Sequence, residues 1–280
     1  MKKIILITCL LAAVTSFAAL PDSIILESGN VRVRLDSRKR WNMNRIEYKG
    51  ELLCVDNSHS HYGAVCRPID FKFGVGSGHD ESGFAEQVDS LKIFADGQEI
   101  KPQKNIPVTG KKIEVEKHSK LLTISVKYRI VLENDLIFEF AEAVAEKDIK
   151  LHHFYFFMHP WSPRFTNAYL KYKDQTTLNI TFKSNHSFPN RKFAPYCAWY
   201  DKKSGFGVAT MFATVKGGKK LQRFIWDRPQ YRKDYLCDYF IAKLPAGYAI
   251  AYRSTTAFFC QKDNQKWISD ADNVFEKIKF

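Results

Sequence analysis

Apolar and polar residues alternate along most of this chain, a pattern that predicts β-strands. The clearest alternation is in residues 122–133, where one face carries Leu122, Ile124, Val126, Tyr128, Ile130 and Leu132. Asn134 and Asp135 then predict a turn, and residues 136–145 return as the second strand of a hairpin. Comparable runs predict strands at 24–27, 31–35, 45–55, 88–94, 113–116, 151–158, 178–182, 205–215, 221–226, 236–244 and 248–260.

A helical pattern occurs only near the C-terminus. After Asp263 or Asn264 as a cap, apolar residues recur at helical spacing, namely Trp267, Ile268, Ala271, Val274, Phe275 and Ile278. Many short strands with one helix favour an all-β fold, a large antiparallel β-sandwich with a short C-terminal helix, over a βαβ fold. Since no segment resembles a linker, residues 19–280 are predicted to form a single β-sandwich domain.

The first 18 residues have the layout of a secretory signal peptide. Lys2 and Lys3 precede an apolar run over residues 4–14, and Ser16-Phe17-Ala18 supplies a small-x-small cleavage site. The run is too short to span a bilayer, so we expect no transmembrane segment in the mature chain. We therefore predict cleavage after Ala18 and export to the periplasm or the extracellular space. Lipidation at Cys9 is the alternative, which Thr8 disfavours because it is larger than the residue usually cut.

The composition is basic, with 43 Lys and Arg against 30 Asp and Glu and a formal charge of +13. Such a charge suits anionic partners. For an exported protein these are an acidic polysaccharide or other anionic glycan, lipopolysaccharide or an anionic membrane surface. We expect no nucleic acid partner, because the predicted location and the absence of a binding signature disfavour one. The alternative is a basic surface with no specific ligand.

Five cysteines follow the predicted cleavage site, and their wide spacing lacks any CxxC pair. This spacing indicates neither a zinc site nor a disulfide scaffold. We expect buried thiols with at most one disulfide, for which Cys54 and Cys66 are the hairpin-like candidates. The sequence also lacks the P-loop, GxSxG, HExxH and EF-hand motifs, so no cofactor is predicted.

The segment 151–161 contains the strongest candidate chemistry. In an extended strand, His153, Tyr155, Phe157 and His159 share one face, while His152, Phe154, Phe156 and Met158 share the other. Flat rings with polar tips suit a sugar, and histidine can transfer protons near neutral pH. His153, Tyr155 and His159 are therefore candidate catalytic residues. The alternative is a half-buried strand with ordinary hydrogen-bonded histidines.

Two loops add further candidates. In the first, His59 and His61 have a spacing compatible with a metal site in which His79 would be the third ligand. A loop that contacts substrate through His61 and Tyr62, or a solvated loop, is favoured over this site. No metal is therefore predicted. The second, residues 73–83, is rich in glycine, and its His79 would form an acid/base pair with Glu86 if the loop folds back. A plain connection between strands is the alternative for this loop.

Arginines interleave with aromatic residues in two segments. Residues 223–235 include Arg223, Trp226 and Arg228, and a shorter cluster pairs Trp161 with Arg164. A guanidinium group can bind a carboxylate or sulfate through two hydrogen bonds, and an aromatic ring can stack on a sugar. These five residues are candidate substrate-binding residues. The alternative is surface charge beside core aromatics.

Three segments resemble the galactose-mutarotase-like β-supersandwich proteins, whose fold also occurs in polysaccharide lyases. They are Trp41–Gly50, Ala198–Gly207 and the closing strand Tyr248–Cys260. The resemblance implies a His acid and a Glu base, as in aldose epimerases. The His153 strand is similar to the His-bearing strand of that family, but Glu276 falls in the predicted helix, which argues against epimerisation. In lyases of this fold, Tyr, His and Arg or Asn surround an acidic sugar.

Together these patterns predict an exported carbohydrate-active protein that acts on an acidic polysaccharide by β-elimination. An Arg or His would neutralise the uronate carboxylate, and a Tyr or His would remove the C5 proton and return one to the leaving oxygen. The alternatives are a non-catalytic glycan-binding protein and a structural envelope protein.

Overall fold

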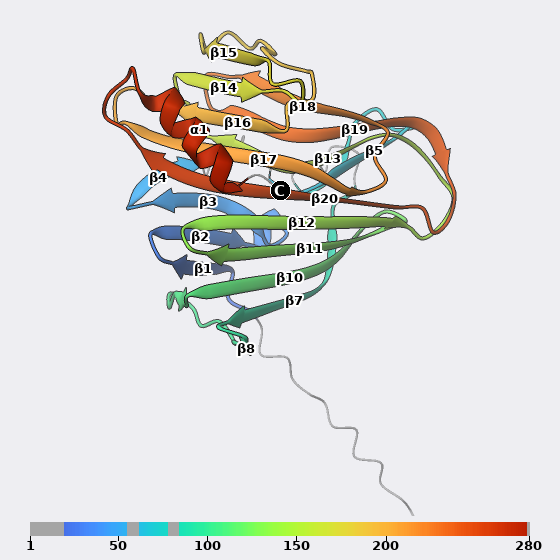
Figure 1. Ribbon diagram of the computed structural model, residues 1–280. Coiled ribbons are helices and arrows are strands. Elements are labelled where there is room, and N and C mark those ends of the chain that lie inside the picture. The colour runs from blue at the N-terminus through green and yellow to red at the C-terminus, as the bar shows by residue number, and fades with distance from the viewer. Residues whose placement is uncertain (1–19, 55–61, 78–83, 279–280) are drawn as a thin grey trace, which may run out of the picture.

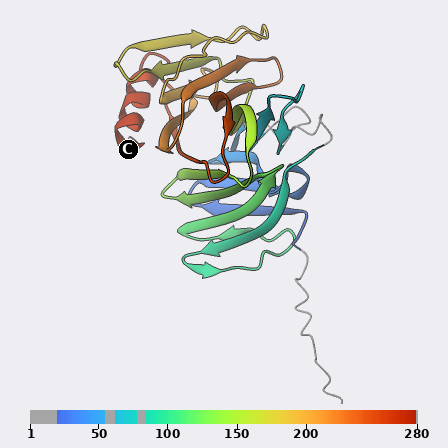
Figure 2. The same ribbon diagram turned by 90° about the vertical axis from the view of Figure 1, so that its right-hand side faces the viewer.

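The computed structural model describes residues 20–54, 62–77 and 84–278, and the predicted leader, His61 and His79 lie outside these ranges. Two large sheets lie face to face as a β-sandwich (Figures 1 and 2). The predicted all-β class with one C-terminal helix is therefore confirmed. No helix within the described ranges is long and apolar enough to cross a membrane.

Sheet A follows the order β18-β19-β13-β4-β3-β2-β1-β9, and β5 pairs with β13 and with β6. Its pairings are antiparallel except for the short contact of β1 with β9. A 3-10 turn, η1 (Ser37–Lys39), joins β2 to β3. The strands are β1 (Ser23–Ser28), β2 (Val31–Asp36), β3 (Asn42–Tyr48), β4 (Glu51–Cys54), β5 (Val65–Pro68), β6 (Val75–Gly76), β9 (Val108–Thr109), β13 (Ile149–Trp161), β18 (Lys220–Asp227) and β19 (Arg232–Leu244).

Sheet B follows the order β15-β14-β16-β17-β20-β12-β11-β10-β7-β8 and is antiparallel throughout. Figure 1 shows it in front of sheet A. Its strands are β7 (Gln87–Ala95), β8 (Gln98–Glu99), β10 (Lys112–Leu121), β11 (Ile124–Glu133), β12 (Leu136–Ala145), β14 (Asn167–Lys171), β15 (Thr177–Thr181), β16 (Tyr196–Tyr200), β17 (Phe206–Lys216) and β20 (Ala249–Cys260).

The alternation in β11 and β12 produces the predicted hairpin. Alternate residues of both strands are buried between the sheets. Asn134 and Asp135 have positive φ angles of 53° and 60°, as a two-residue hairpin turn with the right twist requires. The turn therefore fixes the register in which Glu133 pairs with Leu136.

Helix α1 (Trp267–Ile278) covers part of the outer face of sheet B, and this predicted helix is also confirmed. Its buried side chains pack on outward-facing residues of β14, β16, β17 and β20. The ring of Trp267 stacks on that of Tyr200 with centroids 5.0 Å apart. Figure 2 shows the helix outside the sandwich, at the left of the view.

The five cysteines of the described residues are all free thiols. Cys54 and Cys66 are buried and do not form the predicted disulfide candidate, and Cys54 accepts a hydrogen bond from the hydroxyl of Tyr62 at 3.0 Å. Burial raises the pKa of Cys66 to about 12, so this thiol is unreactive. Cys260 alone of the five is exposed.

Candidate functional site

Strand β13 carries two bulges that decide where its histidines point. Its register with β19 shifts between Leu151 and His153 and again between Phe156 and His159. Phe157, at the second shift, has a positive φ of 51°. An extra residue in a strand reverses which face later side chains occupy. The predicted common face of His153 and His159 is therefore wrong.

Cross-strand partners confirm the reversal. His153 lies opposite Tyr239, and Tyr155 lies opposite Cys237, both of which belong to a cluster on the outer face of sheet A. His159 instead lies opposite Asp234, a residue buried between the sheets. Phe157 also packs inside, against Phe212. The strand thus directs His153, itself only 5% exposed, toward the outer side of sheet A and His159 toward the interior between the sheets.

Aromatic rings cover the outer side of β13, β18 and β19. His153 stacks on Tyr155 at 4.3 Å with an interplanar angle of 18°, and it meets Tyr239 edge-on at 5.6 Å. Phe224 stacks on Tyr235 at 5.2 Å. Trp226 donates a hydrogen bond from its indole nitrogen to the Tyr235 hydroxyl at 2.9 Å. We call this cluster the outer aromatic face. Its partly exposed members are His152, Tyr155, Phe188, Trp226 and Tyr239, and its buried members are His153, Phe224 and Tyr235.

Cationic side chains border the outer aromatic face. The guanidinium of Arg228 lies 4.2 Å from the ring centroid of Trp226, and that of Arg191 lies 4.4 Å from that of Phe188. Lys233 lies 5.5 Å from the ring of Tyr235. Cations over ring faces are held in place by the ring quadrupole. The predicted ligand-binding residues Trp226 and Arg228 thus lie together.

Three titratable groups of this face, those of His152, Tyr155 and Tyr239, are neutral at neutral pH. Burial, and then the charge of Arg67, lower the pKa of His152. Burial raises the pKa of Tyr239 to about 12 and raises that of Tyr155 as well. Nδ1 of His152 and Nδ1 of His153 lie 2.7 Å apart. The face therefore offers phenol donors and the uncharged imidazole of His152 to a ligand, with positive charge at its border.

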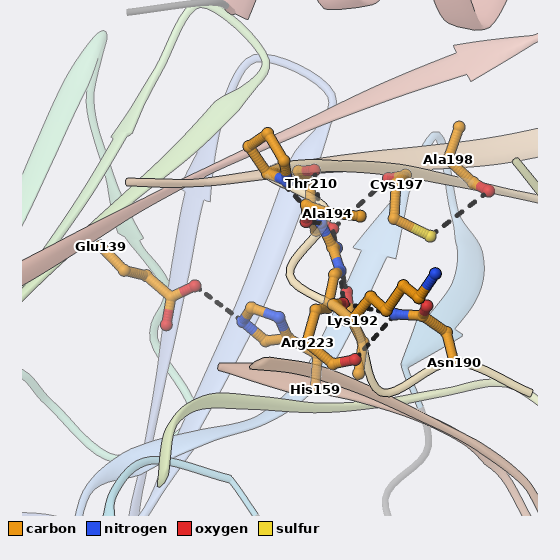
Figure 3. Close-up of polar contacts among 11 residues, drawn as sticks. Glu139, His159, Asn190, Lys192, Ala194, Cys197, Ala198, Thr210 and Arg223 are labelled. Carbon is orange, nitrogen blue, oxygen red and sulfur yellow. Dashed lines mark hydrogen bonds and ion pairs between the residues drawn. The ribbon is translucent and has the colours of Figure 1, made fainter. Parts of the chain in front are cut away.

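The other catalytic candidate, His159, belongs to a buried polar network (Figure 3). Its Nε2 lies 2.7 Å from a carboxylate oxygen of Glu139, and both side chains are 1% exposed. Glu139 also accepts a hydrogen bond from the hydroxyl of Tyr128. Trp161, a predicted binding residue, is fully buried 5.1 Å from the His159 ring. Neither His159 nor Trp161 can contact a polymer at the surface.

The network extends to a buried ion pair. Nζ of Lys117 lies 2.8 Å from Glu86, with both side chains 2% exposed, and 5.5 Å from the centroid of the Tyr128 ring. Burial opposes ionisation of Glu86, but Lys117 and the hydroxyls of Ser77 and Ser119 outweigh it and lower the pKa of this carboxyl. Glu86 is thus committed to Lys117, which leaves no support for its predicted pairing with His79, a residue outside the described ranges.

Arg223 is buried rather than available to an anion. Its guanidinium donates to both carboxylate oxygens of Asp234, at 2.8 and 2.5 Å, and to the carbonyls of Ala194 and Thr210. Both members of this pair are 0% exposed. Figure 3 shows Arg223 beside Thr210 and Ala194. The predicted anion-binding role of Arg223 is incompatible with this burial, because its donors already have partners.

The remaining candidates lie elsewhere. Arg164 pairs with Glu51 at 2.9 Å and with Asp201 at 3.4 Å, away from the outer aromatic face. Tyr62 is buried against Cys54. His61 is outside the described ranges. Within those ranges, no group of three His, Cys, Asp or Glu side chains is arranged to hold a metal ion. Of the predicted site residues, the structure brings together His153, Tyr155, Trp226 and Arg228.

Several members of the outer aromatic face were not predicted. Tyr235 and Tyr239 alternate with the buried Leu236 and Asp238 along β19, so a strand beginning at Arg232 would have placed both tyrosines on one face. His152 was placed on the strand face opposite His153 because the first bulge of β13 is not visible in the sequence. Arg67 and Phe188 come from distant segments that carry no local signal.

Solved structures share this fold over most of the chain. The Slr1438 protein from Synechocystis sp. PCC 6803 superposes with a TM-score of 0.54 over 87% of this chain and 97% of that protein, at 8% identity. A galactose mutarotase-like protein from Clostridium acetobutylicum gives 0.53 over 85% and 95%, at 9% identity. The chain has the galactose mutarotase-like fold.

This fold also occurs as part of longer proteins. The α-N-acetylgalactosaminidase NagBb from Bifidobacterium bifidum matches with a TM-score of 0.55 at 9% identity, over 91% of this chain but only 39% of that protein. No family model matches the sequence, and no curated protein matches it. At these identities the likeness establishes the mutarotase-like fold alone, so function has to be argued from the side chains.

Proposed function

We propose that this mutarotase-like protein is an exported protein that binds an anionic glycan on the outer aromatic face. The observation that carries the proposal is the gathering of rings from β13, β18 and β19 with Arg191 and Arg228 set against them. Aromatic faces pack on the C–H surfaces of sugars, and guanidinium groups bind carboxylate or sulfate. The charge of +13 and the leader-like first 18 residues support an anionic ligand and export.

The binding experiment compares matched ring deletions on the two outer faces of the sandwich. Trp226→Ala removes a ring of the outer aromatic face, and Phe140→Ala removes a half-buried ring from the opposite outer face, on β12. Ligands are polygalacturonate and alginate, with neutral dextran as the uncharged comparison, and affinity is measured by calorimetry. Removal of one stacking ring is expected to weaken binding about tenfold.

The two variants give distinct outcomes. We expect Trp226→Ala to weaken binding of the anionic polymers while Phe140→Ala does not. Equal affinities for Trp226→Ala and the unaltered protein, or equal binding of dextran, would refute the proposed face and its preference for anions.

A second candidate function, β-elimination at the same face, is favoured by the contact between His152 and His153. The lowered pKa of His152 keeps an imidazole neutral, as a base for the C5 proton of a uronate requires. Tyr155, whose raised pKa keeps its proton, stacks on His153 and is the candidate donor to the leaving oxygen. Electrons of the C5–H bond form the C4–C5 double bond as the C4–O bond breaks.

This second function is tested by the ultraviolet absorbance of the unsaturated product. His152→Ala, which removes the proposed base, and Tyr155→Phe, which removes the proposed proton donor, should each abolish product formation while leaving polymer binding measurable. Binding by the unaltered protein without any product across a panel of uronate polymers would leave the glycan-binding function alone.

A further inference from the structure

A groove of about 820 Å³ lies between the β14–β15 hairpin and residues 188–193. Its volume falls within the range of about 300–1,000 Å³ that is usual for ligand clefts. Aromatic side chains and cations both line it, including Tyr172, Lys173, Phe188, Arg191, Lys192 and Phe193. None of these residues was a predicted site residue.

The floor of the groove is held by one buried amide. Asn190, 5% exposed, donates to the carbonyls of Lys192 and Arg223, both at 2.8 Å. Its side-chain oxygen accepts a hydrogen bond from the Tyr172 hydroxyl at 3.0 Å. The two walls are therefore tied together before any ligand arrives, which lowers the entropic cost of binding.

The groove is positively charged. Nζ of Lys173 lies 5.5 Å from the ring centroid of Phe193, and the Arg191 guanidinium lies 4.4 Å from that of Phe188. The one carboxylate among the lining residues, Asp174, accepts hydrogen bonds from the hydroxyl and backbone N–H of Thr176. Cations beside ring faces are the combination that suits a negatively charged sugar.

The groove is continuous with the outer aromatic face. Phe188 lines the groove and also lies 4.1 Å, between ring centroids, from Trp226. Arg191 lies against Phe188 and, at 5.8 Å, against Phe224. The same two side chains therefore belong to both surfaces.

We propose that the groove is a second subsite for the same glycan chain, so that the ligand is a polymer with negative charges on sugars far enough apart to occupy both surfaces. This inference rests on the proposed function. It adds that short oligomers occupy only the outer aromatic face, whereas longer chains also contact Lys173 and Lys192.

The test measures affinity against chain length with oligogalacturonates from the dimer upwards. Lys173→Ala/Lys192→Ala alters the groove at two exposed positions, so the fold should be retained. Lys104→Ala/Lys127→Ala is the control, because it removes the same charge from exposed positions outside the groove. A matched loss of charge is needed since net charge alone changes binding of polyanions.

We expect affinity to rise with length in the unaltered protein, and the groove variant to lose about tenfold for long chains only. The control variant should lose less. If long chains bind the groove variant and the control equally well, the second subsite is wrong while the proposed function stands. Equal weakening of dimers and long chains also refutes it, because the groove would then be the primary site. Failure of the unaltered protein to bind any anionic glycan overturns both proposals.

Discussion

Replacing Asp234 by asparagine removes the counter-charge of a guanidinium that lies wholly inside the sandwich. Arg223 and Asp234 are 0% exposed and joined by two hydrogen bonds. Removing one partner of such a pair costs about 3–5 kcal/mol because the other charge stays buried without compensation. The carbonyls of Ala194 and Thr210 still accept hydrogen bonds from Arg223, so we expect about 3 kcal/mol, the lower end of that range.

The loss is measured as the free energy of unfolding in urea. Asp148→Asn is the control, because Asp148 pairs with Lys243 at the surface and its removal should change stability little. The double variant Arg223→Met/Asp234→Leu removes both charges and should be more stable than Asp234→Asn. A loss below about 1 kcal/mol for Asp234→Asn, the size expected of an exposed pair, would refute the assignment of Arg223 as a structural residue.

Three further outcomes follow from the interior and the surface. The pKa of Glu86 is lowered from its ordinary value of 4.5, so ionised Glu86 stabilises the fold fully at pH values above 4.5. This stability is lost as the pH falls through the lowered pKa of the folded protein. Glu86→Gln should therefore flatten the acid branch of the plot of unfolding free energy, measured in urea, against pH. Cys260 should be the one described thiol that reacts with a thiol reagent in the native protein, and Cys260→Ser should abolish this reaction, whereas labelling that persists in the variant would contradict the burial of the others. Gly207→Ala places a Cβ on the ring of Phe259 and should cost about 1–3 kcal/mol; an unchanged melting temperature would show that the ring moves freely.

Local patterns predicted the fold where strands have one polar face. The β11–β12 hairpin was predicted from the alternation of its strands and from its turn residues, and α1 was predicted from its helical spacing. Both signals lie within short stretches of the sequence. Strand β16 was missed because its five residues are all buried, between the core on one side and α1 on the other. Its sequence therefore has no alternation to detect.

The candidate site was only partly predictable for a similar reason. Residues 154–161 of β13 are almost all buried, so the bulge at Phe157 leaves no polar-apolar signature, and nothing local shows that His159 turns inward. Arg223 was misassigned because an arginine usually indicates a surface, and its partner Asp234 lies on the next strand. Trp226 and Arg228 lie together at the end of β18, and their role in ligand binding stays a prediction.

The outer faces of the two sheets are covered differently, which has a practical consequence for immobilising the protein. Helix α1 packs on the outer face of sheet B, whereas the rings of β13, β18 and β19 lie on the outer face of sheet A. A tether attached after α1 would thus hold the molecule from the side of sheet B. Sensor chips or beads loaded in this orientation should leave the ring-bearing surface pointing into the bulk liquid, open to long chains.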